Sequence, residues 1–168
     1  MDVIKGNVWR FGDNINTDVI IPGRYMNSPL EEMKTHALEM VNPQFPLEVE
    51  KGDIIVGGEN FGCGSSREEA VSVLKASGIT AVVCESFARI FFRNAISIGL
   101  PVIVCPGVSD AFKENDTLEL DLDTATVTNI NLELVLPCES LSTEIKEILS
   151  KGGILPILKD FVKEQSGR

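Results

Sequence analysis

Three nearly continuous apolar runs, at residues 54–56, 79–84 and 100–105, constrain most strongly what this chain can fold into. Such runs are typical of short strands that are buried on both faces of a sheet. Helical patterns separate the runs, over residues 68–77 and 87–98. This alternation predicts parallel strands covered by helices, and ligands of such sheets bind beyond the carboxyl ends of the strands.

The rest of the chain adds strands and helices to this core, without a linker or an internal repeat. Periodicity predicts strands at 4–11, 19–21, 117–122, 126–131 and 132–136, and helices at 30–40, 141–149 and 154–162. The last residues, 163–168, are predicted to fray. We therefore predict a single α/β domain over residues 1–168, in which flanking helices pack on a mixed sheet.

The composition excludes several classes of function. The formal net charge is -10, and an acidic surface argues against binding to nucleic acid or to anionic membranes. No apolar run is long enough for a transmembrane helix, and the first residues lack the basic head and apolar stretch of a signal peptide. The chain is therefore expected in the cytoplasm.

The glycine-rich segment after the first apolar run holds the candidate functional groups. It reads NFGCGSSRE over residues 60–68. Glycines let the backbone come close to a ligand, and the amide groups at the start of the following helix favour an anion. Ser65, Ser66 and Arg67 add two hydroxyls and a planar cation that suits a carboxylate. The segment therefore predicts a carboxylate or phosphate site that also contains a candidate alkoxide base.

The simpler interpretation of this segment is a capped helix after a tight turn, with Ser65 or Ser66 as the cap. That interpretation explains one serine and two glycines, but it leaves the other serine and Arg67 without a role. The segment lacks the Gly-Lys-Ser/Thr of a Walker A motif, the spacing of the dinucleotide fingerprint and the Gly-x-Ser-x-Gly of a hydrolase elbow. Local chemistry thus indicates an anion site without naming a reaction.

Cysteine and histidine usage argues against a metal held by this chain. The cysteines at 63, 84, 105 and 138 form no Cys-x-x-Cys pair, so neither a structural zinc nor an iron–sulfur cluster on this chain alone is expected. Cys84 and Cys105 lie in apolar runs and are predicted to be core residues, whereas Cys63 is interpreted as a small residue in a tight turn. His36 is the only histidine and is predicted to lie on the surface of a helix, which disfavours a Ser-His-Asp triad.

Residues 60–68 resemble the swivel domain of the aconitase family, in particular the separate small subunits of 3-isopropylmalate dehydratase and archaeal homoaconitase. Three further segments agree in the same order: GDNINTDVIIP at 12–22, SFARIFFRNA at 86–95 and GGIL at 152–155. The resemblance spans nearly the whole chain. It implies a swivelling β/β/α fold and a hydro-lyase reaction, in which a 2-hydroxy di- or tricarboxylate is dehydrated to an enoate and rehydrated at the neighbouring carbon.

The resemblance also implies a large catalytic subunit as partner, in a heterodimer or a heterotetramer. That subunit carries the 4Fe-4S cluster of the family, whose iron binds the substrate. Ser65 matches the catalytic base of the family, and Asp18 matches an acid that orients the site near the cluster. Ser66 and Arg67 match contacts to a substrate carboxylate. A serine is a usable base only if its alkoxide is stabilised, and helix amides together with Arg67 supply that stabilisation.

A loop made of Tyr25, Met26, Asn27 and Ser28 matches the part of the family that discriminates between substrates. The resemblance implies an arginine at the position of Asn27 in homoaconitase-like members and a small apolar residue in isopropylmalate enzymes. Asn27 is neither, since it cannot neutralise a third carboxylate and suits a branched alkyl group poorly. By family frequency the expected reaction converts 2-isopropylmalate to 3-isopropylmalate in leucine biosynthesis. Methylmalate, 2,3-dimethylmalate and homoaconitate stay open as alternative substrates.

A function of a different class also stays open, namely a non-catalytic module that binds an organic anion. The same glycine loop would serve such a module. The two functions differ in their need for a large subunit that bears cluster cysteines, because only the enzyme requires one.

Overall fold

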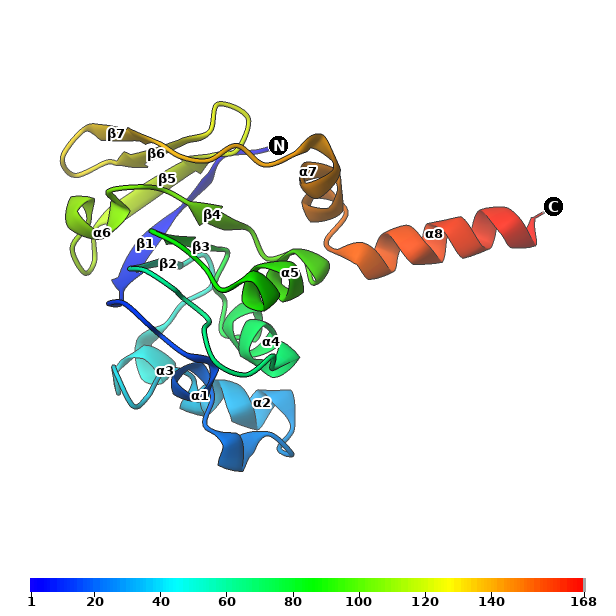
Figure 1. The fold of residues 1–168 in the computed structure, drawn as a ribbon, viewed down its shortest axis with the longest axis horizontal. Helices are drawn as coiled ribbons and strands as arrows, with labels where there is room; N and C mark the ends of the chain where they lie inside the picture. The colour runs from blue at the N-terminus through cyan, green and yellow to red at the C-terminus, as the bar shows by residue number, and fades with distance from the viewer. Residues whose placement is uncertain (168) are drawn as a thin grey trace.

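The computed structural model describes residues 1–167 and contains one seven-stranded mixed sheet (Figure 1). The order of the strands across the sheet is β4-β3-β2-β1-β5-β6-β7. The strands are β1 (Ile4–Arg10), β2 (Ile54–Gly57), β3 (Ala81–Cys84), β4 (Val102–Val104), β5 (Thr117–Asp121), β6 (Thr126–Asn129) and β7 (Leu134–Pro137). Strands β1 to β4 are parallel, and β5 to β7 extend the sheet from β1 in antiparallel order. The predicted mixed sheet with flanking helices is confirmed.

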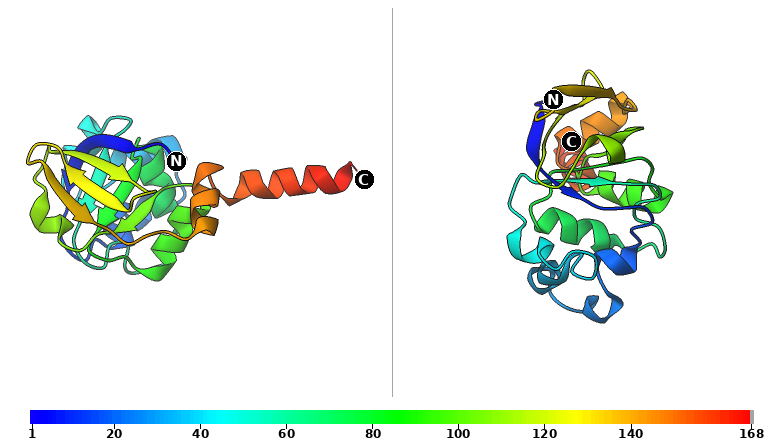
Figure 2. Two further views of the ribbon diagram at one scale, coloured as in Figure 1. Left: turned by 90° about the horizontal axis from the view of Figure 1, so that it is seen from above. Right: turned by 90° about the vertical axis from the view of Figure 1, so that its left-hand side faces the viewer.

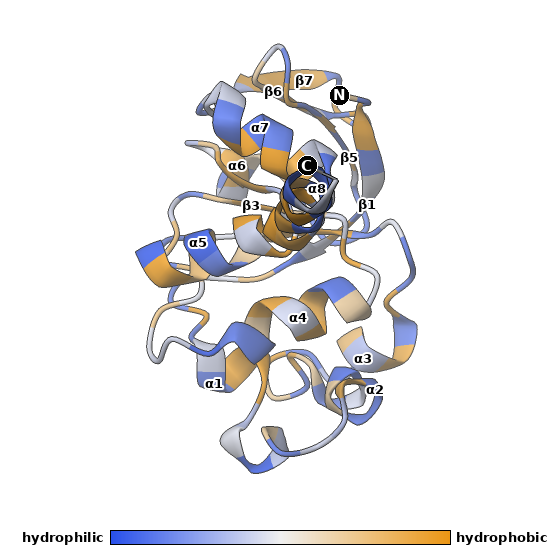
Figure 3. Ribbon diagram, turned by 90° about the vertical axis from the view of Figure 1, so that its right-hand side faces the viewer, coloured by the Kyte–Doolittle hydropathy of each residue, from blue (hydrophilic) through white to orange (hydrophobic). Residues whose placement is uncertain are grey.

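The parallel half of the sheet is the centre of the core. Every residue of β2 and β3 is buried, as their unbroken apolar runs predict. Helices α4 (Glu68–Ala76) and α5 (Arg89–Ser97) connect β2, β3 and β4 and lie side by side beneath them (Figure 1). Figure 3 shows this pair between the sheet and three short helices, α1 (Thr17–Ile20), α2 (Leu30–Met33) and α3 (Phe45–Glu48). The loops that leave β2 and β3 therefore start at the same edge of the sheet.

The predicted strand at residues 19–21 is wrong, because these residues belong to α1 and the turn that follows it. The Asn16 side chain accepts a hydrogen bond from the Val19 amide at 2.9 Å and caps the helix. Ile20 and Ile21 are nevertheless fully buried. A run of three apolar residues is too short for periodicity to separate a strand from a buried helix, and here the cap decides.

The helix predicted over residues 30–40 is shorter than expected. A 3-10 turn, η2 (Lys34–His36), follows α2, and the chain then turns inward. Leu38 is fully buried, and its amide donates to the Ile20 carbonyl at 3.0 Å. Burial of this side chain ends the helix early and ties the segment to α1.

Helices α7 (Thr143–Ser150) and α8 (Ile154–Ser166) end the described part of the chain. The prediction that the chain frays from residue 163 is wrong for the described residues, because α8 continues to Ser166. This helix runs away from the rest of the molecule, and none of its residues is buried (Figures 1 and 2). None of the helices within residues 1–167 is long and apolar enough to cross a membrane. The remaining short helices are η1 (Gly23–Tyr25) and α6 (Val108–Ala111).

Candidate active site

The loop between β2 and α4 is held at the edge of the sheet by a neighbouring segment on each side. On one side, the Asn60 amide donates to the Ser86 hydroxyl at 2.8 Å and the Phe61 amide donates to the Ser86 carbonyl at 3.1 Å. On the other side, the Thr17 amide donates to the Cys63 carbonyl at 2.9 Å. The predicted meeting of the glycine loop with the turn after β3 is confirmed, and α1 joins them.

At Gly62 only a glycine fits. Its φ is +81°, and a Cβ atom there would lie 2.1 Å from Cγ of Phe91. Phe91 in turn packs edge-on against Phe61, with ring centroids 5.4 Å apart. The Gly62 amide donates to the Ile15 carbonyl at 2.7 Å, so the backbone of the loop is fixed directly over α5.

Ser65, the predicted base, lies at the exposed tip of this loop and contacts Thr17. The two hydroxyl oxygens are 3.0 Å apart, and the Thr17 hydroxyl also donates to the Ser65 carbonyl at 3.0 Å. A threonine hydroxyl carries a single proton, so Thr17 can stabilise a deprotonated Ser65 oxygen only by turning that proton from the Ser65 carbonyl to the serine oxygen, which lies at the same distance. Thr17 is 2% exposed, which fixes this hydroxyl in place. Thr17 was not predicted as a site residue, although it directly precedes Asp18 in a segment that resembles the family.

Arg67 and Asp18 come together as an ion pair between Nη1 of the arginine and Oδ1 of the aspartate. The same nitrogen lies 3.4 Å from the Ile21 carbonyl oxygen, and a Cβ atom on Gly23 would lie 3.4 Å from Nη2. The Arg67 side chain is 26% exposed, whereas the Asp18 side chain is 65% exposed. The guanidinium is therefore fixed from one side and can meet a carboxylate from the other.

The prediction that Ser65 or Ser66 caps α4 is wrong. Arg67 occupies the cap position, its amide donates to the Ser65 carbonyl at 2.9 Å, and no side chain of the described residues caps this helix. The Ser65 hydroxyl is engaged with Thr17 instead, and Ser66 is exposed. Without a cap, the first amide groups of α4 stay free to face an anion.

The loop with the predicted substrate contacts begins at Gly23, which lies against the guanidinium described above. Tyr25, Met26 and Ser28 are half-buried, whereas Asn27 is exposed. The Ser28 amide donates to the Tyr25 carbonyl at 2.9 Å. This bond closes a turn that presents Asn27 at its surface.

His36 lies in the 3-10 turn η2 rather than within the predicted longer helix, and it is only partly exposed. Its ring stacks on the ring of Tyr25, with centroids 3.7 Å apart and planes 5° apart. Its Nδ1 lies 3.0 Å from Oε2 of Glu39, and 26% of the side chain is exposed. The sequence carries no signal for this contact, because it depends on how two separate turns approach each other.

The described residues do not suit an iron–sulfur cluster. No group of three or more His, Cys, Asp or Glu side chains within residues 1–167 is placed to hold a metal ion. Cys84 and Cys105 are buried, as predicted, and burial raises the pKa of the Cys84 thiol well above its ordinary value. Burial, with a smaller contribution from Cys138, raises the pKa of Cys105 to about 12. Because a cluster binds thiolates, these two thiols are poor ligands for one.

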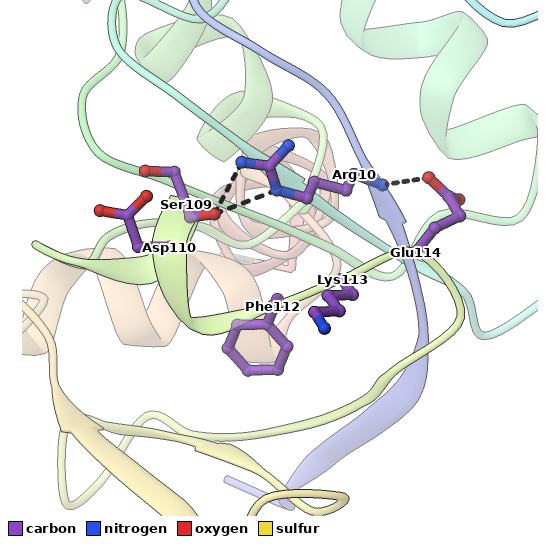
Figure 4. Close-up of a pocket in the computed structure, with 6 residues that line it drawn as sticks. All are labelled: Arg10, Ser109, Asp110, Phe112, Lys113 and Glu114. Atoms are coloured by element: carbon purple, nitrogen blue, oxygen red, sulfur yellow. Dashed lines mark hydrogen bonds between the residues drawn. The ribbon is translucent and has the colours of Figure 1, made fainter.

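An open hollow of about 440 Å³ lies beside β1 and α6 (Figure 4). It is lined by Arg10, Ser109, Asp110, Phe112, Lys113 and Glu114. The Arg10 guanidinium donates twice to the Ser109 carbonyl, at 2.9 and 3.0 Å, and the Arg10 amide donates to the Glu114 carboxylate at 3.1 Å. The Arg10 cation is therefore engaged by the chain itself, and the hollow shares no residue with the loop around Ser65.

The residues of the candidate site lie in the part of the chain that matches a known family. A family model described as the aconitase C-terminal domain matches residues 12–106. The isopropylmalate/citramalate isomerase small subunit of Methanocaldococcus jannaschii is 48% identical over 163 residues, which cover 96% of this chain and 97% of that protein. A 3-isopropylmalate dehydratase small subunit of Methanopyrus kandleri is 50% identical over 159 residues, which cover 94% of each protein.

Other relatives extend the range of substrates named and provide a solved structure. The homoaconitase small subunit of Methanothermobacter thermautotrophicus is 46% identical over 154 residues, which cover 91% of this chain and 89% of that protein. The crystal structure of 3-isopropylmalate dehydratase from M. jannaschii matches with a TM-score of 0.92 at 43% identity and covers 99% of both chains. The chain therefore belongs to the aconitase family, as a protein with the aconitase C-terminal domain.

Proposed function

We propose that this chain is the small subunit of an iron–sulfur hydro-lyase that isomerises 2-isopropylmalate to 3-isopropylmalate, a step of leucine biosynthesis. The observation that carries the proposal is the pairing of Ser65 with Thr17 beside an arginine that Asp18 holds in place. Proton abstraction next to a carboxylate requires a base and a cation that binds the carboxylate, and this loop carries both groups. The names of relatives that match over nearly their whole length support the same reaction.

In the proposed reaction the Ser65 oxygen, as alkoxide, takes a proton from the carbon next to a carboxylate. The carbon–hydrogen bond breaks, and its electron pair forms the double bond of the enoate. The carbon–oxygen bond breaks as well, and the hydroxyl leaves with that electron pair as hydroxide, for which the cluster of the family would supply a Lewis acid. Addition of water to the double bond, with the hydroxyl on the neighbouring carbon and the proton on the carbon that first bore the hydroxyl, gives the isomer. While the Ser65 oxygen is charged, the Thr17 hydroxyl turns its one proton from the Ser65 carbonyl to that oxygen. Arg67 binds the carboxylate through two parallel hydrogen bonds, Ser66 adds a hydroxyl contact, and Asp18 keeps the guanidinium oriented.

The proposed site is only half complete on this chain. Ser65, Ser66 and Asp18 are exposed, whereas this chemistry needs a site that excludes water. We assign the covering surface to a large subunit, which the "small subunit" names of the relatives support, in a heterodimer or a heterotetramer. We also assign the 4Fe-4S cluster of the family to that subunit, because the buried thiols described above are poor ligands. A cytoplasmic location fits the four free cysteines.

A smaller substituted malate is the second candidate substrate. Asn27 is a short, neutral and exposed side chain in the loop that starts beside the Arg67 guanidinium. Such a residue tolerates a methyl group more readily than a branched alkyl group, and a relative from M. jannaschii is named for both isopropylmalate and citramalate. We therefore expect methylmalate to be turned over by the same site.

The test is co-expression with the large subunit of the same organism, followed by anaerobic reconstitution of the cluster. Ultraviolet absorbance then measures enoate formation from 2-isopropylmalate, 3-isopropylmalate, citramalate, 2,3-dimethylmalate and homocitrate. We expect enoate from isopropylmalate only when both subunits are present. If the chain binds carboxylates tightly but forms no active complex with any large subunit, it is an anion-binding module. That result would refute the proposed enzymatic function.

A further inference from the structure

We propose that His36 is a positioning residue that holds the substrate loop at residues 24–28 in one conformation. The proposal rests on the function proposed above, since it concerns how that loop meets the substrate. It arises from the contacts of His36 within the chain, which are an aromatic ring on one face and a carboxylate at Nδ1.

Four side chains form a closed set of contacts around the loop. The His36 ring stacks on Tyr25, and its Nδ1 faces Oε2 of Glu39. The other oxygen of Glu39 lies 3.7 Å from Nη2 of Arg24, and the Arg24 guanidinium lies over the Tyr25 ring, 4.8 Å from its centroid. The Glu39 carboxylate and the Tyr25 ring thus each contact both the histidine and the arginine.

The two ends of this set differ in how firmly the fold holds them. His36 directly precedes Ala37 and Leu38, which are fully buried. Tyr25 lies in a 3-10 turn without a fully buried residue, and its half-buried ring packs against the edge of the core. The stack therefore adds a second attachment of the loop, through His36, to the segment that is buried at Ala37 and Leu38.

The attachment through His36 affects the turn that includes Asn27, the residue expected to meet the substrate. The Tyr25 carbonyl accepts the Ser28 amide, so fixing Tyr25 fixes the turn that includes Asn27. Loss of the stack should let this turn sample other conformations and weaken substrate binding. The step of proton abstraction should be little affected, because Ser65 and Thr17 lie on other segments.

The experiment compares His36→Ala, His36→Phe and the control Lys34→Ala in the complex with the large subunit. Lys34 is on the same turn as His36, and within residues 1–167 its ion pair is with Glu31 on the surface. We expect His36→Ala to raise KM for isopropylmalate about three- to tenfold with kcat within twofold, which is the size of a lost aromatic stack. His36→Phe keeps the stack and should restore KM, and Lys34→Ala should match the wild type.

A second measurement on the chain by itself separates this proposal from the proposed function. Trypsin cleaves after Arg24 in the loop and after Lys151 in the turn before α8, and mass spectrometry quantifies both products. We expect His36→Ala to speed cleavage after Arg24 and to leave cleavage after Lys151 unchanged. Equal cleavage after Arg24 in His36→Ala and wild type, or a KM that does not move, would overturn the role of His36. An inactive wild-type complex would instead refute the proposed function, and the cleavage rates would still decide whether His36 orders the loop.

Discussion

At the scale of single residues, the proposed site depends on one cation whose position the fold determines. Arg67 is held by the Asp18 carboxylate and the Ile21 carbonyl, and it is seated where Gly23 leaves room. A planar guanidinium can keep these contacts with one edge and offer another edge to a carboxylate. A lysine carries the same charge, but it is a point charge on a flexible stem.

Replacing Arg67 with lysine should therefore impair the enzyme although the net charge is unchanged. Loss of a charged, two-point contact should lower kcat/KM for isopropylmalate about 10- to 100-fold. Steady-state kinetics of the two-subunit complex measures this, with Arg10→Lys as control for the same substitution outside the site. An unchanged kcat/KM would mean that Arg67 contributes only diffuse charge.

Asn27 should set which malate the enzyme accepts. An uncompensated third carboxylate beside it would cost several kcal/mol, whereas one surplus methylene costs only about 1–3 kcal/mol. We therefore expect homocitrate to be rejected more strongly than any alkylmalate. Asn27→Arg should improve kcat/KM for homocitrate, and Asn27→Val should improve it for isopropylmalate. If neither variant gains on its substrate, Asn27 does not contact the variable group of the substrate.

At the scale of secondary-structure elements, the sequence predicts the elements with strong local signals and misses those set by tertiary contacts. The parallel core and the glycine loop were predictable, because buried strands and helix starts leave long apolar runs and glycines in the sequence. The helix α1 was not, because the Asn16 cap outweighs a three-residue apolar run. The contact of Ser65 with Thr17 and the stack of Tyr25 on His36 join segments far apart in the chain or in separate turns, so no local pattern indicates them.

Glu85 follows β3, and its carboxylate binds the start of α6. The contribution of this contact to the stability of the chain depends on pH. The Glu85 carboxylate accepts hydrogen bonds from the Ser109 hydroxyl at 2.7 Å and from the Ser109 and Gly107 amides at 2.9 Å. Burial acts to raise the pKa of Glu85, but these hydrogen bonds outweigh it and lower the pKa below its ordinary value. The contribution of Glu85 to the free energy of unfolding is therefore complete above the ordinary glutamate pKa of about 4.3. It is lost as pH falls through the lowered pKa of the folded chain.

Glu85→Gln should accordingly destabilise the chain at neutral pH but not in acid. We expect a loss of about 1 kcal/mol in the free energy of unfolding at pH 7, the lower part of the range for charged hydrogen bonds because the carboxylate is partly exposed. Urea unfolding of wild type and variant at pH 7 and at pH 3 measures the difference. If the difference in the free energy of unfolding between wild type and variant is the same at pH 7 and at pH 3, the carboxylate charge is not responsible for it.

At the scale of the whole molecule, the chain presents an incomplete site on an otherwise acidic protein. Its net charge is -10, yet Arg67 places a cation on the same loop as the exposed serines. A site with an exposed base and no covering wall cannot exclude water by itself. The whole-molecule arrangement thus favours a protein that works only when a second subunit closes over the loop.

The purified chain alone should therefore contain no iron and show no dehydratase activity. Its two buried thiols are held as protonated core residues, which leaves them unsuited to a cluster. Iron and sulfide assays on anaerobically purified chain, before and after mixing with the large subunit, measure this directly. If the chain alone contains stoichiometric iron, and this iron is lost when its cysteines are mutated, the assignment of the cluster to the large subunit is refuted.

The measurement that tests the central claim most directly is turnover by Ser65→Ala in the reconstituted two-subunit complex. The variant should keep its thermal unfolding midpoint and its association with the large subunit, because Ser65 is exposed at a loop tip. Loss of a proton-transfer group should lower kcat by about 10²- to 10⁴-fold. Activity within a few-fold of the wild type, in a complex that assembles normally, would contradict the assignment of Ser65 as the base.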